Sequence, residues 1–414
     1  MTGQSLSKSY SKVVNTLIFI FPIVIISLQV VGDIILFILA MMGIFVAISK
    51  KISPFSIKEI KVFSYLTFGY FIAVCLSVIF SGQLAELAHY IPRDFYFFFA
   101  PFIALTLFKA EININYLIVG AKISLLVLGM IVILQLLSGV TLAERPSGIM
   151  NAGVFGNLSV SLFFIVLVFS RHELFIYKIF TLLSLSSGLF IIIASGTRGA
   201  WLSFLLLLAT YLFFLYKQKT IFNIKSKIIT VIIIACIVSI GSLNQKIYDR
   251  TSLVYSEMSS WISGDRPEVP TSVGLRLEMY KKAIDNIEDV PFFGHGYRTS
   301  NIALFQNDMS SAGRLLVGFN HLHNSYLTNY YNGGIPLLGA LLLLLFVPLR
   351  LFLKANSQNR EDPLFISGAL LTLGYASHGM VNILLGDTYM NGFYIFFLAI
   401  FMLLNAKSIK AQQM

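Results

Sequence analysis

The sequence predicts an all-α polytopic membrane protein, and three observations point to that class. Apolar residues make up 57% of the 414 residues and charged residues only 12%. Mean hydropathy is +0.81. Apolar runs of about 18 residues or more recur along the chain, as helices that cross a hydrocarbon core about 30 Å thick require. A water-soluble globular domain is therefore excluded.

The apolar runs predict about twelve transmembrane helices with short connections between most of them. The expected spans are residues 13–30, 32–48, 62–80, 95–109, 116–138, 152–170, 178–195, 199–216, 228–244, 327–349, 363–385 and 391–405. The first run is long and lacks a small-residue cleavage site, so we expect it to stay as the first span. Both cysteines, Cys75 and Cys236, lie inside apolar runs, where we expect free thiols and no disulfide.

Lysine and arginine are distributed unevenly over the connections, and this predicts an orientation. The segments on the side of the N-terminus hold 18 of the 30 basic residues, whereas the short connections on the other side hold only Arg93, Arg145 and Arg198. Because positive charge favours the cytoplasmic side, we expect both termini in the cytoplasm of a bacterium. The net charge of +11 thus reflects membrane topology and not a nucleic-acid partner.

One long polar segment divides the chain into three expected parts. Residues 1–244 hold nine predicted spans, residues 245–326 form the polar segment, and residues 327–414 hold three spans and a cytoplasmic tail. With twelve spans, the polar segment lies on the periplasmic side. It carries most of the residues that can do chemistry.

The first half of this segment predicts a short helix on the membrane surface. Val254, Met258, Trp261 and Ile262 recur at helical spacing, which puts Trp261 at the level of the lipid headgroups. A polar stretch that contains two prolines ends this helix.

A second helix is predicted to follow. Ser272 can cap its N-terminus, and Leu277, Tyr280, Ile284 and Ile287 form one apolar stripe along it. The sequence from Pro291 to Gly296 ends this helix.

Arg198 lies in the sequence Ser-Gly-Thr-Arg-Gly, in a tight turn between two predicted spans. An arginine at this depth can simply extend its side chain to the lipid headgroups. Arg198, however, lies on the side where short connections avoid positive charge, and the small residues around it let another group approach closely. A functional role is therefore favoured.

Arg276 lies in the first part of the second helix, where it could pair with Glu278 or with a lipid phosphate. Free N–H groups at a helix N-terminus and a planar guanidinium are together well suited to a diphosphate. Arg93 and Arg145 are weaker candidates for binding a phosphate or an acidic sugar.

His321 and His323 precede the tenth predicted span in the sequence Asn-His-Leu-His-Asn. We interpret His321 as an interfacial residue and His323 as the candidate general base, because Asn324 follows His323 directly at the start of the apolar run. Nearby arginines would disfavour the protonated imidazole and keep it available as a base near neutral pH. His378, inside an apolar run, is a polar residue of the bundle interior or a further functional residue.

No bound metal is expected, because His-x-His spacing is not specific for zinc and no cysteine or carboxylate completes the set. Two arginines and one histidine at the membrane boundary suit group transfer from a lipid diphosphate. The arginines stabilise the leaving diphosphate, and the base deprotonates an acceptor hydroxyl group.

At these residues the chain resembles the O-antigen ligase family, within the superfamily that includes O-antigen polymerases. The resemblance rests on three motifs: Thr197-Arg198 in a turn, Ser-x-Gly-x-Arg-x-x-Met-Tyr from Ser272 to Tyr280, and His-Leu-His-Asn from His321 to Asn324.

The resemblance implies a GT-C-type glycosyltransferase fold in the inner membrane of a Gram-negative bacterium. Such ligases move a polysaccharide from undecaprenyl diphosphate onto lipid A–core at the periplasmic face, without a metal or nucleotide cofactor. By motif position Arg198 and Arg276 would bind the diphosphate and His323 would activate the acceptor hydroxyl group. His321, Tyr280 and Asn324 are further candidates for substrate binding.

Three alternatives remain open at this point. An O-antigen polymerase would use the same donor and the same arginines. A flippase for lipid-linked oligosaccharides would carry charges deep within its spans, but only Lys122 and His378 are deeply placed here. A non-catalytic scaffold protein of the cell envelope is the third alternative.

Overall fold

The chain is a multi-pass helical membrane protein. The computed structural model describes residues 2–86, 91–142, 144–170, 175–217, 256–263, 272–358 and 362–412, and all regular elements within these ranges are helices. Ten helices in the described ranges are long and apolar enough to cross a membrane. The predicted all-α fold class is thus confirmed.

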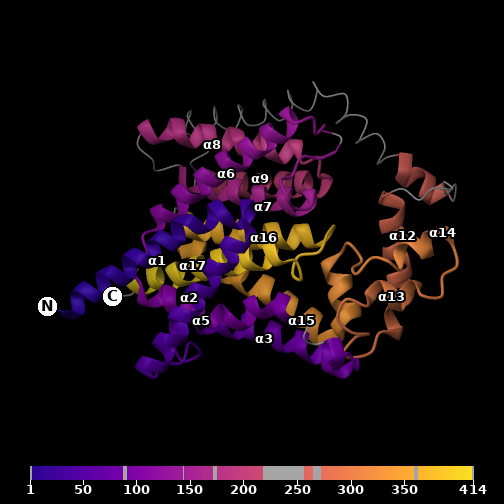
Figure 1. Cartoon of the computed structure of the whole chain (residues 1–414), viewed down its shortest axis with the longest axis horizontal. Helices are drawn as coiled ribbons and strands as arrows, with labels where there is room; N and C mark the ends of the chain where they lie inside the picture. Colours follow the sequence, from indigo (N-terminus) through magenta and orange to yellow (C-terminus); the bar gives the residue numbers. More distant parts are fainter. Residues whose placement is uncertain are drawn as a thin grey trace.

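Eight long helices occupy the described residues between 2 and 217 (Figure 1). They are α1 (Thr2–Ser27), α2 (Gln29–Lys50), α3 (Lys58–Phe80), α5 (Phe95–Lys109), α6 (Ile114–Leu137), α7 (Ala152–Phe169), α8 (Phe175–Ala194) and α9 (Arg198–Lys217). Two short 3-10 helices, η1 (Leu84–Glu86) and η2 (Ile91–Asp94), lie between α3 and α5. The predicted span over residues 228–244 lies outside the described residues.

Short helices form the second part of the described chain. Residues 256–263 are helical. They are followed by α12 (Ser272–Asp285), η5 (Ile287–Asp289), α13 (Ser300–Phe305) and α14 (Ser311–Leu316). A small core of their own holds them together: Met279 and Ala283 of α12 pack with Phe305, Leu316 and Leu322.

The last three helices are α15 (Ser325–Gln358), α16 (Pro363–Gly379) and α17 (Thr388–Gln412). α15 bends at Gly334, where φ is +61°. A Cβ atom at this position would overlap the carbonyl oxygen of Phe292, so the chain needs glycine there. The bend brings the segment before α13 against α15.

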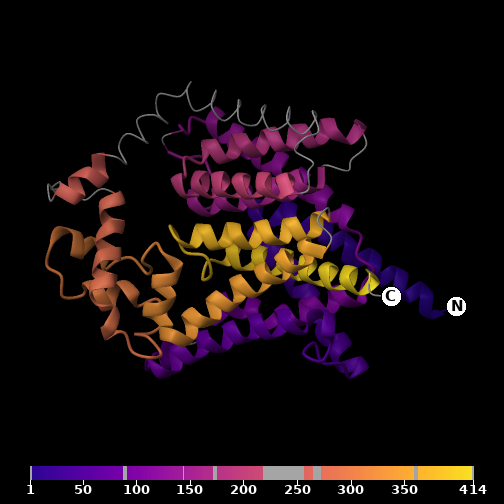
Figure 2. The same ribbon diagram turned by 180° about the vertical axis from the view of Figure 1, so that it is seen from behind.

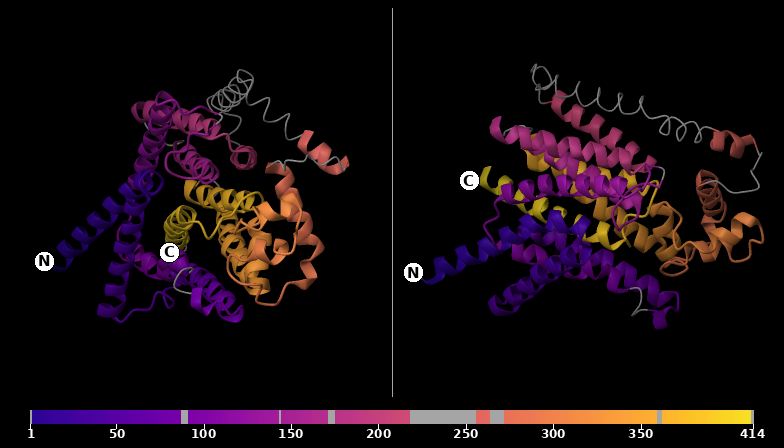
Figure 3. Two further views of the ribbon diagram at one scale, coloured as in Figure 1. Left: turned by 45° about the vertical axis from the view of Figure 1, so that its right-hand side comes forward. Right: turned by 45° about the horizontal axis from the view of Figure 1, so that its top comes forward.

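Both chain termini lie at one end of the helix bundle, and the α12–α14 segment lies at the opposite end (Figures 1 and 2). In both views of Figure 3 this segment projects beyond the long helices. Within the bundle α1 packs on α6, α2 on α5, and α15 between α3 and α16. α17 runs through the interior, where its residues 393–401 are almost completely buried.

The predicted apolar stripe of the second short helix is buried only in part. Ile284 is 59% exposed and Ile287 is 40% exposed, whereas the buried face of α12 carries Met279 and Ala283. The face of α12 that is buried is the one that packs on α13 and α14. The spacing of apolar residues along α12 alone does not reveal these neighbours. The predicted second helix is present as α12, which the structure describes from Ser272 onward.

Candidate active site

The turn between α8 and α9 is held in a fixed position on α7. Gly196 adopts a φ of +58°, and the Thr197 hydroxyl donates a hydrogen bond to the carbonyl oxygen of Ala152 at 2.9 Å. Arg198 is the first residue of α9, and 32% of its side chain is exposed. The turn therefore presents this guanidinium at the end of the bundle where the α12–α14 segment lies.

Arg145 supports the same turn from the connection between α6 and α7. Its Nη2 atom donates a hydrogen bond to the Gly196 carbonyl oxygen at 3.2 Å. Its φ of +64° lies in the left-handed region, which a residue other than glycine adopts only when its surroundings impose it. Arg145 thus contacts the turn at Gly196, two residues before Arg198 in the sequence.

Arg276 is half-buried on α12 and lies within electrostatic range of Arg198. Burial lowers the pKa of the Arg276 guanidinium, and the positive charge of Arg198 acts in the same direction. An arginine remains charged at neutral pH even so. Two cations close enough to influence each other in a partly buried place favour the binding of an anion.

Tyr280 joins α12 to the histidine motif. Its hydroxyl group donates a hydrogen bond to the carbonyl oxygen of His323 at 2.8 Å and lies 3.5 Å from the carbonyl oxygen of Met380. Arg276 and Tyr280 are four residues apart and so lie on one face of the helix. This face points toward the histidines.

The histidine motif is positioned by the start of α15. The Asn324 side chain accepts hydrogen bonds from the backbone N–H groups of Tyr326 at 3.0 Å and Leu327 at 3.1 Å, as an N-terminal capping residue does. Leu322 is fully buried, and its N–H group donates to the Thr328 hydroxyl at 3.0 Å. His323 adopts a φ of +50°, so the backbone at the candidate base is strained.

The two imidazoles of the motif are in contact, with ring centroids 4.3 Å apart and planes inclined by 80°. The backbone N–H group of His323 donates to Nδ1 of His321 at 3.2 Å, so the proton of a neutral His321 lies on Nε2. Nδ1 of His323 is buried and has no hydrogen-bond partner among the residues that the structure describes. The Asn382 side chain, which follows α16, also hydrogen-bonds the His323 imidazole.

Both histidines are neutral near pH 7. Burial lowers the pKa of His321 to about 4, with a further contribution from the charge of Arg276. Burial lowers the pKa of His323 to about 3, and His321 and Arg276 act in the same direction. The sequence predicts that a nearby arginine disfavours the protonated imidazole, and in the structure this arginine is Arg276. Loss of hydration lowers the two histidine pKa values more than Arg276 does.

This shift predicts the pH dependence of any reaction that uses His323 as a base. A histidine with the ordinary pKa of 6.5 is only about 3% neutral at pH 5. With a lowered pKa the imidazole of His323 stays unprotonated, so we expect the rate to stay nearly constant between about pH 5 and 7. Single-turnover rates over this range are the measurement, and a tenfold decline centred near pH 6.5 would contradict the prediction.

Arg93 belongs to a different set of residues. It lies in η2, and its carbonyl oxygen accepts a hydrogen bond from the Asn391 side chain at 3.0 Å. The adjacent Asp94 is fully buried and accepts a hydrogen bond from the Tyr297 hydroxyl at 2.5 Å. These contacts join α5 to α17 and to the segment before α13, and they do not include the two histidines.

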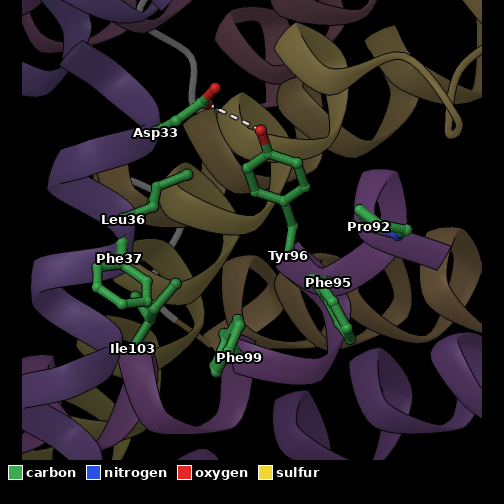
Figure 4. Close-up of a pocket in the computed structure, with 8 residues that line it drawn as sticks. All are labelled: Asp33, Leu36, Phe37, Pro92, Phe95, Tyr96, Phe99 and Ile103. Atoms are coloured by element: carbon green, nitrogen blue, oxygen red, sulfur yellow. Dashed lines mark hydrogen bonds between the residues drawn. The ribbon is translucent and has the colours of Figure 1, made fainter. Parts of the chain in front are cut away.

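A pocket of about 220 Å³ lies between α2 and α5, near η2 (Figure 4). Phe37, Phe95 and Phe99 line its apolar part. The Tyr96 hydroxyl donates to the Asp33 carboxylate at 2.8 Å across its upper part. Among the described residues that line this pocket there is a carboxylate but no arginine or lysine, so the pocket does not suit a diphosphate.

Sequence reasoning did not find two residues at the site, Glu257 and Asn382. An Oε2 atom of Glu257 lies 3.9 Å from Nη1 of Arg198. Asn382 contacts His323 from the connection between α16 and α17. Both lie more than 50 residues from their partners, so no local pattern in the sequence could indicate them.

His378 lies in α16 and is 2% exposed. Neither of its ring nitrogens has a hydrogen-bond partner among the described residues, and the same is true of the Oδ1 atom of the nearby Asn157. The structure thus places His378 in the bundle interior, in keeping with one of the two interpretations of the sequence. Among the described residues no group of three or more metal-binding side chains is found.

Part of the chain that contains this site matches a known protein family. Residues 179–344 match the family described as O-antigen ligase. This part of the chain is similar to the O-antigen ligase family. The matched region contains Arg198, Arg276, Tyr280 and both histidines of the motif, whereas Arg145 lies outside it. The recognition from three motifs is thereby confirmed.

A relative in Haemophilus influenzae (strain ATCC 51907 / DSM 11121 / KW20 / Rd) is described as an uncharacterized protein. It is 27% identical over 215 residues, which are 50% of this chain and 52% of the relative. The chain thus matches about half the length of this relative. The family match covers residues 179–344 and does not extend to the remaining helices.

Proposed function

We propose that this protein is an O-antigen ligase that transfers a polysaccharide from undecaprenyl diphosphate to a sugar hydroxyl group of lipid A–core. One observation carries the proposal. Arg198, Arg276 and His323 come from three distant parts of the sequence and meet at one end of the bundle, where each lies within electrostatic range of at least one other. The family match to residues 179–344 supports the same class of reaction.

Arg198 and Arg276 would hold the diphosphate of the donor. Each guanidinium offers a planar set of N–H donors that matches the geometry of phosphate oxygens. Charge builds up on the diphosphate as the bond to the sugar breaks, so two fixed cations stabilise the transition state more than the bound donor. Arg145 contributes by holding the turn that carries Arg198.

His323 would activate the acceptor. Its neutral imidazole takes the proton of the acceptor hydroxyl group while the hydroxyl oxygen attacks the anomeric carbon. The bond between that carbon and the diphosphate oxygen breaks, and undecaprenyl diphosphate leaves with the electron pair. Attack from the face opposite the leaving group inverts the anomeric configuration. Tyr280 and Asn324 keep the backbone of His323 in position, and His321 keeps the surroundings of the base neutral.

The proposed location is the inner membrane of a Gram-negative bacterium, with a GT-C-like arrangement of helices. Both termini lie at the end of the bundle opposite the α12–α14 segment. With the positive connections on the cytoplasmic side, the arginines and histidines of the site face the periplasm. The side chains of the site can perform the proton transfer and bind the leaving group without a metal or nucleotide cofactor.

The proposal is tested by lipopolysaccharide gels of a strain that lacks the gene. We expect bare lipid A–core, with polymer accumulating on undecaprenyl diphosphate, and restoration of the full pattern by the intact gene. Core capped by a single repeat would indicate a polymerase instead. Purified protein that transfers glycan from a lipid diphosphate donor to lipid A–core would exclude a flippase and a scaffold protein.

A further inference from the structure

The short helix over residues 256–263 turns a polar face toward the protein. Met258 is 44% exposed and Ile262 is 73% exposed, whereas Glu257 and Trp261 are largely covered. These two residues are four apart and lie side by side on one face. The sequence predicts Val254, Met258, Trp261 and Ile262 on one helix at the membrane surface. In the structure Met258 and Ile262 are exposed and Trp261 is partly buried, and Val254 lies outside the described residues.

Two polar atoms on this inner face have no hydrogen-bond partner within the part of the chain that the structure describes. They are Oε2 of Glu257 and Nε1 of Trp261, and both are buried. A buried polar atom without a partner is unfavourable, so in a native protein it calls for an explanation, and a bound ligand is one. Here one is a hydrogen-bond acceptor and the other is a donor.

Glu257 also indicates where this face lies. Its Oε2 atom is 3.9 Å from Nη1 of Arg198, and 14% of its side chain is exposed. This distance is too long for a hydrogen bond, so the carboxylate retains its capacity to accept one. The Glu257 carboxylate therefore lies beside the arginine to which we assign the donor diphosphate, and Trp261 follows one turn further along the same helix face.

The chemistry of the two atoms selects the kind of ligand. A phosphate group bound directly by these two residues is unfavourable, because the Glu257 carboxylate would repel it. An apolar ligand would leave both polar atoms unsatisfied. A sugar satisfies both, because one hydroxyl group can donate to the carboxylate while another accepts from the indole N–H group.

We propose that Glu257 and Trp261 bind hydroxyl groups of the sugar that is joined directly to the donor diphosphate. The inference rests on the proposed function, since it takes Arg198 as a diphosphate ligand. It adds a specificity site: the helix over residues 256–263 distinguishes a glycan-bearing lipid diphosphate from the bare lipid diphosphate that remains after transfer. This distinction favours release of the spent carrier and binding of a new donor.

The test compares two ligands in direct binding measurements with the purified full chain. One is undecaprenyl diphosphate bearing a single sugar, and the other is undecaprenyl diphosphate alone. For Glu257→Gln we expect about tenfold weaker binding of the sugar-bearing lipid, and for Trp261→Phe about fivefold, as the loss of one hydrogen bond implies. Binding of the bare lipid diphosphate should change less than twofold in Trp261→Phe. In Glu257→Gln it should stay the same or become tighter, because the lost carboxylate lies 3.9 Å from Arg198 and repels phosphate.

The matched control is Glu288→Gln, which removes the same charge from an exposed residue of η5 and should leave both affinities unchanged. Equal loss of both ligands in either variant, or unchanged binding of the sugar-bearing lipid in both variants, would overturn the inference. If the intact protein bound neither lipid, the proposed function itself would fail, so the two failures are distinguishable.

Discussion

Replacing His323 by alanine is expected to lower the rate of glycan transfer by about 100- to 10,000-fold, the range that a general base contributes. Donor affinity should change less than about threefold, because the imidazole is neutral and contributes no charge to the diphosphate site. The reason lies in its surroundings: burial lowers the pKa of His323 to about 3, and one ring nitrogen has no hydrogen-bond partner among the described residues.

The measurement separates chemistry from binding. Single-turnover transfer gives the rate, and equilibrium binding of the sugar-bearing lipid diphosphate gives the affinity and shows that the variant is folded. His295→Ala is the matched control, because His295 stacks on Tyr331 outside the arginine–histidine cluster. A His323→Ala protein that transferred glycan at the normal rate would show that the base lies elsewhere.

Features that depend on local sequence could be predicted. Long apolar runs indicate membrane helices because a backbone in hydrocarbon must satisfy its own hydrogen bonds. The turn at Thr197 and Arg198 could be located because small polar residues interrupt two such runs. The start of α12 at Ser272 could be predicted because serine favours helix N-termini.

Features that depend on contacts between distant residues could not be predicted. The bond from Tyr280 to the carbonyl oxygen of His323 spans 43 residues, and the bond from Arg145 to Gly196 spans 51. The exposure of Ile284 on α12 likewise follows from which neighbours pack on the helix. The residue types of the site were visible in the sequence, but the bonds that hold their geometry were not.

Replacing Arg276 by alanine is expected to weaken donor binding by about 100-fold, since loss of a partly buried charged hydrogen-bond donor costs about 2–5 kcal/mol. Arg276→Lys should recover only part of this affinity, because an ammonium group restores the charge without the planar set of donors. The charge of Arg276 acts on both histidines, so its loss moves the pKa of His323 upward. Burial is the larger cause of the shift, however, and the base therefore stays neutral at pH 7.

The slower transfer of Arg276→Ala is therefore expected to result entirely from weaker donor binding, and kinetics can test this. At saturating donor the transfer rate should recover in part, whereas in His323→Ala added donor should have no effect. Arg314→Ala removes an exposed arginine of α14 and serves as the control, with donor affinity unchanged. If Arg276→Ala bound the donor with normal affinity, Arg276 would not be a ligand of the diphosphate. The diphosphate would then lie away from α12 and be held by Arg198 without Arg276.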